Sequence, residues 1–162
     1  MSENILEINN LSKYFGGLAA VSGCSLKVKK GTITGIIGPN GSGKTTLAKL
    51  LLGLISPNSG EILIDRTNLE KLSMTWYRKQ LAYIPQNCQI LSSSINDNIL
   101  IGNNKLNDQE IGRLLQTVGL DNELKNSDLT LNEPINFNIS KGISKKIHIA
   151  RALAHNLSLI HI

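Results

Sequence analysis

The nine residues GPNGSGKTT, Gly38 to Thr46, constrain the fold more than any other part of this chain. They contain the pattern G-x-x-x-x-G-K-[ST], with its fixed positions at Gly38, Gly43, Lys44 and Thr45. Glycines in such a loop let the backbone curl so that successive N–H groups face a phosphate, and the following helix adds the positive end of its dipole. The pattern therefore predicts a strand, a phosphate-binding loop and a helix in succession.

The side chains of the loop have separate predicted roles. The Lys44 amine would reach the β- and γ-phosphates of a nucleotide, and the Thr45 hydroxyl would bind Mg²⁺. A β-branched stretch, TITGII, precedes the loop, and an apolar helical pattern follows it from Lys44 to Leu54, which argues against a chance match. The predicted nucleotide-binding residues of the loop are Gly38, Pro39, Asn40, Gly41, Ser42, Gly43, Lys44, Thr45 and Thr46.

Strand-like and helix-like patterns alternate along the chain. The stretches expected to form strands are ILEI, SLKV, TITGII, EILI, LAYI and LSLIHI. The stretches expected to form helices are 44–54, WYRKQ, SINDNIL, DQEIGRLLQTVG with Asn107 or Asp108 as its N-cap, and SKKIHIARALAH. Residues 122–138 are expected to form a polar loop. This alternation indicates an α/β fold with a largely parallel sheet and a helix-rich inserted subdomain.

Composition excludes several classes of protein. Hydrophobic residues make up 41% of the 162 residues, which is typical of a soluble globular domain. The longest apolar run, LLLGLI, is far shorter than a membrane span, and the first residues lack the layout of a secretory signal. We therefore expect a cytoplasmic protein that reaches a membrane only through a partner. The charge of +5 comes from scattered residues, so we expect no nucleic-acid partner. Cys24 and Cys88 are expected to be unpaired buried thiols.

The sequence around the loop narrows the choice among nucleotide-binding classes. A GTPase would carry N-K-x-D, and the nearest text, NKLN, lacks the aspartate. The loop alone leaves a small-molecule kinase open. However, the long stretch from LSKYFGGLAAVSG through the loop to SGEILID resembles the first half of an ABC-transporter ATP-binding domain. LAYIPQ and LSSSINDNILIG are similar to the exporter branch of that family, and ISKGISKKIHIARAL lies where the family has its signature segment.

The resemblance implies a phosphate-loop NTPase core with an N-terminal antiparallel β-subdomain and an inserted helical subdomain, incomplete at the C-terminus. On this view, residues 1–87 are the nucleotide-binding core and β-subdomain. Residues 88–145 are the helical subdomain, and residues 146–162 return to the core. The implied cofactors are ATP and Mg²⁺.

Two further site residues are implied by the resemblance. The aromatic residue after LSK stacks on adenine in this family. Its spacing indicates Phe15, with Tyr14 as the second choice, and core packing is the alternative role for Phe15. Gln86 corresponds to a catalytic glutamine whose amide oxygen can reach Mg²⁺ and the attacking water, although a glutamine after a proline can also be an ordinary loop residue. The segment after Gln86 contacts the membrane-spanning subunit in the family.

The signature segment departs from the family pattern L-S-G-G-Q. The corresponding residues are Ile139, Ser140, Lys141, Gly142 and Ile143. In the family this segment contacts ATP bound to a second ATP-binding domain, so a homodimeric or heterodimeric partner is implied. Lys141 could pair with a phosphate, or its bulk could keep the nucleotide away. We favour an impaired site, which would fit an exporter heterodimer with one degenerate site.

The acidic residues that hydrolysis needs are the remaining question. The family places a Mg²⁺-binding aspartate and a catalytic glutamate at the end of a buried strand. Asp65 in EILID is not expected to be this aspartate, because Arg66 follows it and the resemblance places it in a β-hairpin. Counted from Arg151, the acids would fall immediately after Ile162. The three histidines are expected to be ordinary helix or strand residues: His148, His155 and His161.

Three functions are compatible with these observations. The first is the ATP-binding subunit, or part of one, of an ABC exporter, lying at the inner face of a membrane through its partner. As an enzyme it would be an ABC-type ATPase, but the 162-residue chain is expected not to turn over ATP alone. The second is a non-catalytic nucleotide-binding module or defective fragment. The third, a soluble ABC protein of translation or repair, would need two such domains in one chain.

Overall fold

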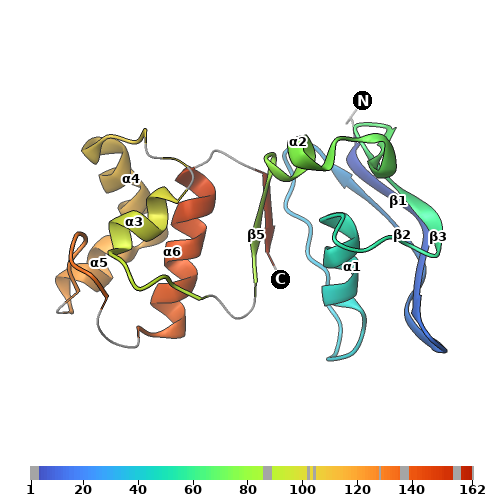
Figure 1. The fold of residues 1–162 in the computed structure, drawn as a ribbon, viewed down its shortest axis with the longest axis horizontal. Helices are drawn as coiled ribbons and strands as arrows, with labels where there is room; N and C mark the ends of the chain where they lie inside the picture. The colour runs from blue at the N-terminus through green and yellow to red at the C-terminus, as the bar shows by residue number, and fades with distance from the viewer. Residues whose placement is uncertain are drawn as a thin grey trace. The chain divides into compact units, whose positions relative to one another are not determined.

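The computed structural model describes residues 4–85, 89–101, 103, 105–127, 129–135, 139–154 and 158–161. These residues form two compact units (Figure 1). The N-terminal unit ends at Lys79, and the helical unit runs from Gln80 to His161. The phosphate-loop sequence lies in the N-terminal unit, and the signature segment lies in the helical unit.

The N-terminal unit contains an antiparallel sheet in the order β2-β1-β3-β4 (Figure 1). Its strands are β1 Asn4–Phe15, β2 Leu18–Lys29, β3 Ser59–Ile64 and β4 Thr67–Asn68. The strands predicted at ILEI, SLKV and EILI are therefore confirmed. Asp65 and Arg66, with φ of 45° and 65°, form the turn between β3 and β4, as expected for a two-residue hairpin. Asp65 thus lies in a hairpin turn, as predicted, and not at the end of a buried parallel strand.

Helices pack with this sheet to form the core of the N-terminal unit. They are α1 Lys44–Leu51, the 3₁₀ turn η1 Leu69–Lys71 and α2 Met74–Arg78. The helix predicted at 44–54 is confirmed but ends at Leu51, and the helix predicted at 76–80 lies two residues earlier, at Met74–Arg78. The buried side chains come from one face of α1, from the sheet and from α2: Leu47, Ala48, Leu50, Leu51, Ile8, Leu11, Ile62 and Tyr77. This packing holds α1 by its C-terminal two turns and leaves its N-terminal end, with the loop, near the surface.

The strand predicted at TITGII is wrong for the described structure. Residues 33–40 have no regular secondary structure, and Ile33 and Ile37 are 103% and 99% exposed. A strand rich in β-branched residues needs neighbours on both sides to bury its side chains and pair its backbone. No strand of the described N-terminal sheet pairs with this stretch.

The helical unit begins and ends with a pair of parallel strands, β5 Leu81–Ile84 and β6 Ser158–His161. The strands predicted at LAYI and LSLIHI are confirmed. Among the described residues, parallel pairing is confined to these two strands. Between them lie the helices α3 Ile95–Leu100, α4 Asp108–Val118, α5 Leu120–Lys125 and α6 Lys141–Ala154.

Local capping signals explain where these helices begin. Ser94 and Asp97 form a capping box at the start of α3, and Asn107 and Glu110 form another at the start of α4. Of the two N-caps predicted for α4, the structure therefore selects Asn107. Gly119, with φ of 68°, ends α4 and begins α5.

Two helix predictions need correction. Residues 122–125, expected to be loop, belong to α5, because Leu120 inserts into the core and holds a short helix there. Helix α6 begins at Lys141, three residues earlier than expected, because the Ser140 side chain caps it.

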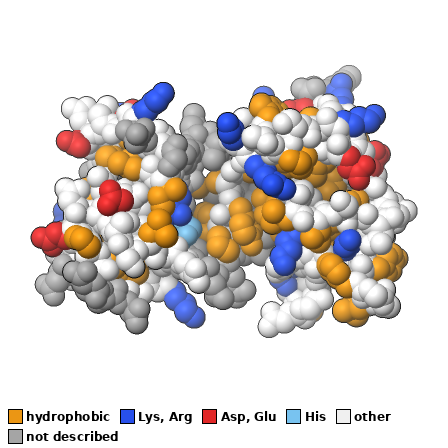
Figure 2. Space-filling view, viewed as in Figure 1, with side chains coloured by type: hydrophobic (Ala, Val, Ile, Leu, Met, Phe, Trp, Pro, Cys, Tyr) orange, Lys and Arg blue, Asp and Glu red, His pale blue; other side chains and the backbone are white. Residues whose placement is uncertain are grey.

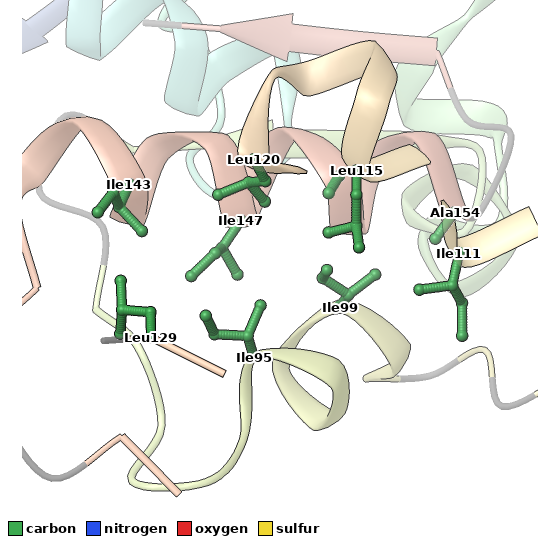
Figure 3. Close-up of a cluster of buried hydrophobic side chains, with 10 residues drawn as sticks. Ile95, Ile99, Ile111, Leu115, Leu120, Leu129, Ile143, Ile147 and Ala154 are labelled. Atoms are coloured by element: carbon green, nitrogen blue, oxygen red, sulfur yellow. The ribbon is translucent and has the colours of Figure 1, made fainter. Parts of the chain in front are cut away.

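One apolar cluster holds the helical unit together, and Figure 3 shows its side chains converging between α3 and α6. Its fully buried members include Ile95 and Ile99 of α3, Leu120 of α5 and Ile147 of α6. Within the described ranges, no helix is long and apolar enough to cross a bilayer.

Candidate functional site

The loop before α1 is tightly wound, and Gly43 at its end leaves no room for a side chain. Gly41 and Gly43 both have φ of 83°, a region that side chains disfavour. A Cβ added to Gly38 would lie 2.5 Å from Ser42 Oγ, and one added to Gly43 would lie 2.2 Å from the Ala20 carbonyl oxygen of β2. The glycines thus bring the loop backbone close to the Ser42 side chain and to the backbone of β2, which suits a cradle of main-chain N–H groups.

Lys44 closes this loop. Its Nζ donates to the carbonyl oxygens of Gly38, at 2.7 Å, and Pro39, at 2.8 Å, and to Ser42 Oγ at 3.2 Å. No side chain caps α1 at Gly43, so no capping oxygen competes for the free N–H groups of the first turn. A cation and the positive end of a helix dipole therefore lie together at one place, which is the requirement for binding a phosphate.

An exposed aromatic strand end lies beside the loop. Gly43 abuts Ala20 of β2, and the preceding residues of β2, Ala19 and Leu18, pair with Tyr14 and Phe15 of β1. The Phe15 side chain is 51% exposed and that of Tyr14 is 42% exposed, so neither ring belongs to the core. The Lys13 amine lies 5.4 Å from the centroid of the Phe15 ring. The structure thus brings a surface available for base stacking into the neighbourhood of the loop.

The charge of the N-terminal unit favours an anionic ligand. Its described residues include ten lysines and arginines but only four aspartates and glutamates. Figure 2 shows these basic side chains scattered over the unit's visible face. A spread positive field attracts a small polyanion such as a nucleotide without defining a basic patch.

The oxygen ligands predicted for Mg²⁺ are a hydroxyl and an amide. Thr45 is exposed in the first turn of α1, so its hydroxyl is free to meet a metal bound to phosphates. Gln86 lies outside the described residues. The described part of the chain holds no cluster of three His, Cys, Asp or Glu side chains that could bind a metal without the nucleotide. Mg²⁺ is commonly bound by one or two protein oxygens together with phosphate oxygens of the nucleotide. The predicted hydroxyl and amide oxygens therefore fit this ion.

The signature segment lies at the start of α6. Ser140 Oγ accepts from the Ile143 N–H at 3.2 Å, so this hydroxyl caps the helix. Lys141 and Gly142 are exposed in the first turn. Ile143, where the family pattern has glutamine, is only 9% exposed and belongs to the apolar cluster (Figure 3). The departure at this position therefore stabilises the helical unit by packing.

The structure describes two of the three histidines and one of the two cysteines. His148 is buried in α6, where its Nδ1 lies 3.0 Å from the Ser144 carbonyl oxygen. His161 lies in β6, and His155 falls outside the described residues. Cys24 is unpaired, as predicted, although it is half-buried rather than buried, and Cys88 also falls outside the described residues.

Sequence reasoning missed one buried polar network in the helical unit. Asn98 of α3 is fully buried, and its Nδ2 donates to the Leu91 and Ser94 carbonyl oxygens and to Ser93 Oγ. Arg151 of α6 donates to the Asn98 carbonyl oxygen at 2.6 Å and to its Oδ1 at 3.2 Å. The available signal was the position of Asn98 three residues after Ile95, a helical spacing that places it at the apolar face of SINDNIL.

A glycine loop closed on a lysine at the start of a helix, beside exposed aromatic rings, defines a phosphate-loop nucleotide-binding protein. A family model described as "ABC transporter" matches residues 21–162. The chain therefore belongs to the ABC transporter family, in its ATP-binding domain. The fold, an α/β domain with an N-terminal antiparallel sheet and a helical part, agrees with this assignment.

Curated relatives give the family context. The chain is 36% identical over 139 residues to the "Putative export ATP-binding/permease protein" of Rickettsia typhi, an alignment that covers 84% of the chain and 24% of the relative. It is 31% identical over 162 residues to the "Putative HMP/thiamine import ATP-binding protein YkoD" of Bacillus subtilis, with 98% of the chain and 28% of the relative covered. The chain thus spans about a quarter of the length of these relatives.

A solved structure has the same fold. The "Structure of a bacterial Atm1-family ABC exporter with ATP bound" matches 99% of the chain with a TM-score of 0.88 and 24% identity, and the match covers 29% of that protein. At this identity the likeness concerns the fold.

Proposed function

We propose that this chain is the ATP-binding part of an ABC exporter and that it binds MgATP at the loop of residues 38–46. The observation that carries the proposal is the closure of the loop on Lys44, whose amine meets two loop carbonyl oxygens. In the assembled transporter, ATP binding and hydrolysis are then coupled to transport across a membrane.

Each residue of the site has one task in this proposal. Bound ATP supplies the phosphoanhydride, and Mg²⁺ neutralises its phosphate oxygens. Lys44 would exchange its loop carbonyl partners for phosphate oxygens, and Thr45 would hold the metal through its hydroxyl. Phe15 stacks on the base. Gln86 orients water beside the metal.

The names of several relatives support an exporter with a membrane-spanning partner. The Rickettsia typhi protein and a Haemophilus influenzae protein are both described as ATP-binding/permease proteins. Import also occurs among the relatives, as the Bacillus subtilis name states. We favour export because LSSSINDNILIG resembles the exporter branch and forms α3 with its capping box. The chain then lies on the cytoplasmic side of the membrane through its partner.

We further propose that the 162-residue chain binds ATP without turning it over alone. Asp65, which follows the strand in EILID, lies in the β3–β4 turn and not at the end of a buried parallel strand, which supports this proposal. A second ATP-binding domain is the expected partner, and the altered signature at Lys141–Ile143 makes one nucleotide site of the pair weak. The second candidate function is a non-catalytic binding module. Such a module would bind ATP at the same loop but would not hydrolyse it in any assembly.

Phosphate release tests the proposal. The chain should be assayed beside a version extended by Asp-Glu and the following strands of an exporter relative. We expect release only from the extended version, and its loss on Lys44→Ala. Robust release by the short chain, abolished by the same substitution, would contradict the assignment and direct the search for acids to Asp65. An extended version that binds ATP without turnover would favour the non-catalytic module.

A further inference from the structure

The C-terminal end of the phosphate-loop helix is held by side chains of α2. Helix α1 is only eight residues long, and isolated helices shorter than about 12 residues are marginal in water. Its last carbonyl groups therefore need partners from elsewhere if the helix is to keep its place.

The backbone itself satisfies three of these carbonyl groups. The N–H groups of Leu52, Gly53 and Leu54 donate to the carbonyl oxygens of Ala48, Leu50 and Lys49, at 2.9, 3.0 and 2.9 Å. Gly53 has φ of 62°, and the pair of bonds from Gly53 and Leu54 is a Schellman motif. The carbonyl groups of Leu51, Leu52 and Gly53 receive nothing from this motif.

Two adjacent residues of α2 supply those three bonds. The Tyr77 hydroxyl donates to the Leu51 carbonyl oxygen at 2.9 Å, and the bond is buried. Arg78 donates from Nε to the Leu52 carbonyl oxygen at 3.3 Å and from Nη2 to that of Gly53 at 2.7 Å. The guanidinium also places a positive charge at the negative end of the α1 dipole.

The packing around these bonds is close. A Cβ added to Gly53 would lie 2.6 Å from Met74 Sδ, so α2 sits directly on the turn that ends α1. Tyr77 is 3% exposed, and burial raises the pKa of its hydroxyl to about 12. The hydroxyl therefore remains a donor throughout the neutral and moderately alkaline range.

From this geometry we propose that Tyr77 and Arg78 are positioning residues for the phosphate loop. They clamp the C-terminal end of α1, and α1 begins at Lys44, about 12 Å away at 1.5 Å per residue. Loss of the clamp lets the short helix fray from its C-terminal end, and the first turn then holds phosphates less well. The role deepens the proposed ATP binding and rests on it, while the clamp itself exists without nucleotide.

The test uses single substitutions in the full chain. Tyr77→Phe removes the hydroxyl. Arg78→Gln removes the guanidinium and its positive charge, whereas Arg78→Lys keeps the charge but removes the paired donors of the guanidinium. Lys79→Gln is the matched control, because it removes an exposed charge from the end of the same helix without touching α1. Hydrogen exchange of the α1 amides is measured without nucleotide, and MgATP affinity is measured well below the melting temperature.

We expect Tyr77→Phe and Arg78→Gln each to accelerate exchange in α1, from Leu47 to Leu51, with the β1 and β3 amides unchanged. Each should raise the MgATP dissociation constant about 3- to 10-fold, the loss expected for one or two hydrogen bonds. Arg78→Lys should show an intermediate effect, and Lys79→Gln none. A merely structural role would lower the melting temperature without changing affinity in the cold.

Unchanged α1 exchange in both variants, or an equal effect of Lys79→Gln, would overturn the clamp. Faster exchange with unchanged affinity would confine the two residues to stability and also overturn the proposal. A wild-type chain that binds no MgATP would refute the proposed function. In that case the exchange measurement still decides whether α2 clamps α1.

Discussion

At the scale of single residues, the loop takes its shape from the backbone freedom of its glycines, and the affinity for phosphate that we propose depends on the Lys44 amine. Gly43 is fixed by two independent constraints, a φ of 83° and the Ala20 carbonyl oxygen where a side chain would stand. The aromatic residue beside it is less constrained, because Tyr14 and Phe15 are neighbours in β1 and both are partly exposed. Adjacent strand residues point to opposite faces, so only one of the two can face a bound base.

Substitution of the aromatic residues tests which one stacks. Phe15→Ala should weaken ATP binding by roughly 1–3 kcal/mol, the range for stacking between a base and an aromatic ring. Tyr14→Ala is the matched control and should change affinity little. The measurement is a titration with a fluorescent ATP analogue. The opposite pattern, with the loss in Tyr14→Ala alone, would move the stacking role by one residue.

His148 makes the stability of the helical unit depend on pH. Burial lowers the pKa of the imidazole below its ordinary value of 6.5; the bond to the Ser144 carbonyl opposes this, and the charge of Arg151 adds to it. The folded protein therefore binds fewer protons than the unfolded chain between the lowered pKa and 6.5. The free energy of unfolding should be at its full value above about pH 6.5 and should fall as the pH drops toward the folded pKa.

Urea unfolding followed by circular dichroism, at pH 7.5 and at mildly acidic pH, measures this effect. His148→Gln keeps a polar side chain in α6 and removes the titration. The decrease in unfolding free energy on acidification should be smaller in the variant than in the wild type. An equal decrease in both proteins would assign the pH dependence to other groups.

At the scale of elements, the helices of the helical unit depend on capping and on one buried amide. Asn98 Oδ1 accepts from the Leu91 N–H at 3.0 Å and from Arg151, and its Nδ2 donates three times. This side chain ties the segment before α3 to α6. Asn96, on the same helix, has a buried Oδ1 with no hydrogen-bond partner.

The two asparagines make a matched pair of substitutions. Asn98→Ala should destabilise the helical unit by about 2–4 kcal/mol, because it leaves several buried groups unpaired. Asn96→Ala should cost less than about 1 kcal/mol, since the oxygen it removes has no partner. Urea denaturation of the two variants measures the difference. Equal losses would mean that the Asn98 network contributes no more than helix propensity does.

The elements also show what a sequence can predict. Capping boxes and period-2 or helical patterns located most strands and helices, since these signals act within a few residues. A local sequence pattern does not show which strands pair with each other. TITGII has the pattern of a strand, but no strand of its unit pairs with it. In the site, the loop followed from its glycines and lysine. The packing of Ile143 and the clamp from Tyr77 and Arg78 are contacts between separate elements, which no local pattern encodes.

At the scale of the whole molecule, the stretch before the loop is an exposed apolar surface. Ile33 and Ile37 are almost completely exposed, and Ile36 is 49% exposed. A β-branched apolar segment without pairing partners promotes self-association. We therefore expect the isolated chain to aggregate, and the double variant Ile33→Thr/Ile37→Thr to aggregate less.

Dynamic light scattering over a concentration series measures this difference. Thr34→Ser, a polar change in the same exposed segment, is the control and should behave like the wild type. Equal self-association of the double variant and the wild type would place the responsible surface elsewhere.

Equilibrium titration of the chain with MgATP measures whether the loop of residues 38–46 binds the nucleotide through Lys44. We expect saturable binding by the wild type and a loss of more than about tenfold in affinity on Lys44→Ala, since charge-assisted hydrogen bonds to phosphate disappear. Lys49→Ala, which removes an exposed lysine from the last turn of the same helix, should retain nearly full affinity. An unchanged dissociation constant for Lys44→Ala, or an equal loss for Lys49→Ala, would mean that Lys44 does not hold the phosphates.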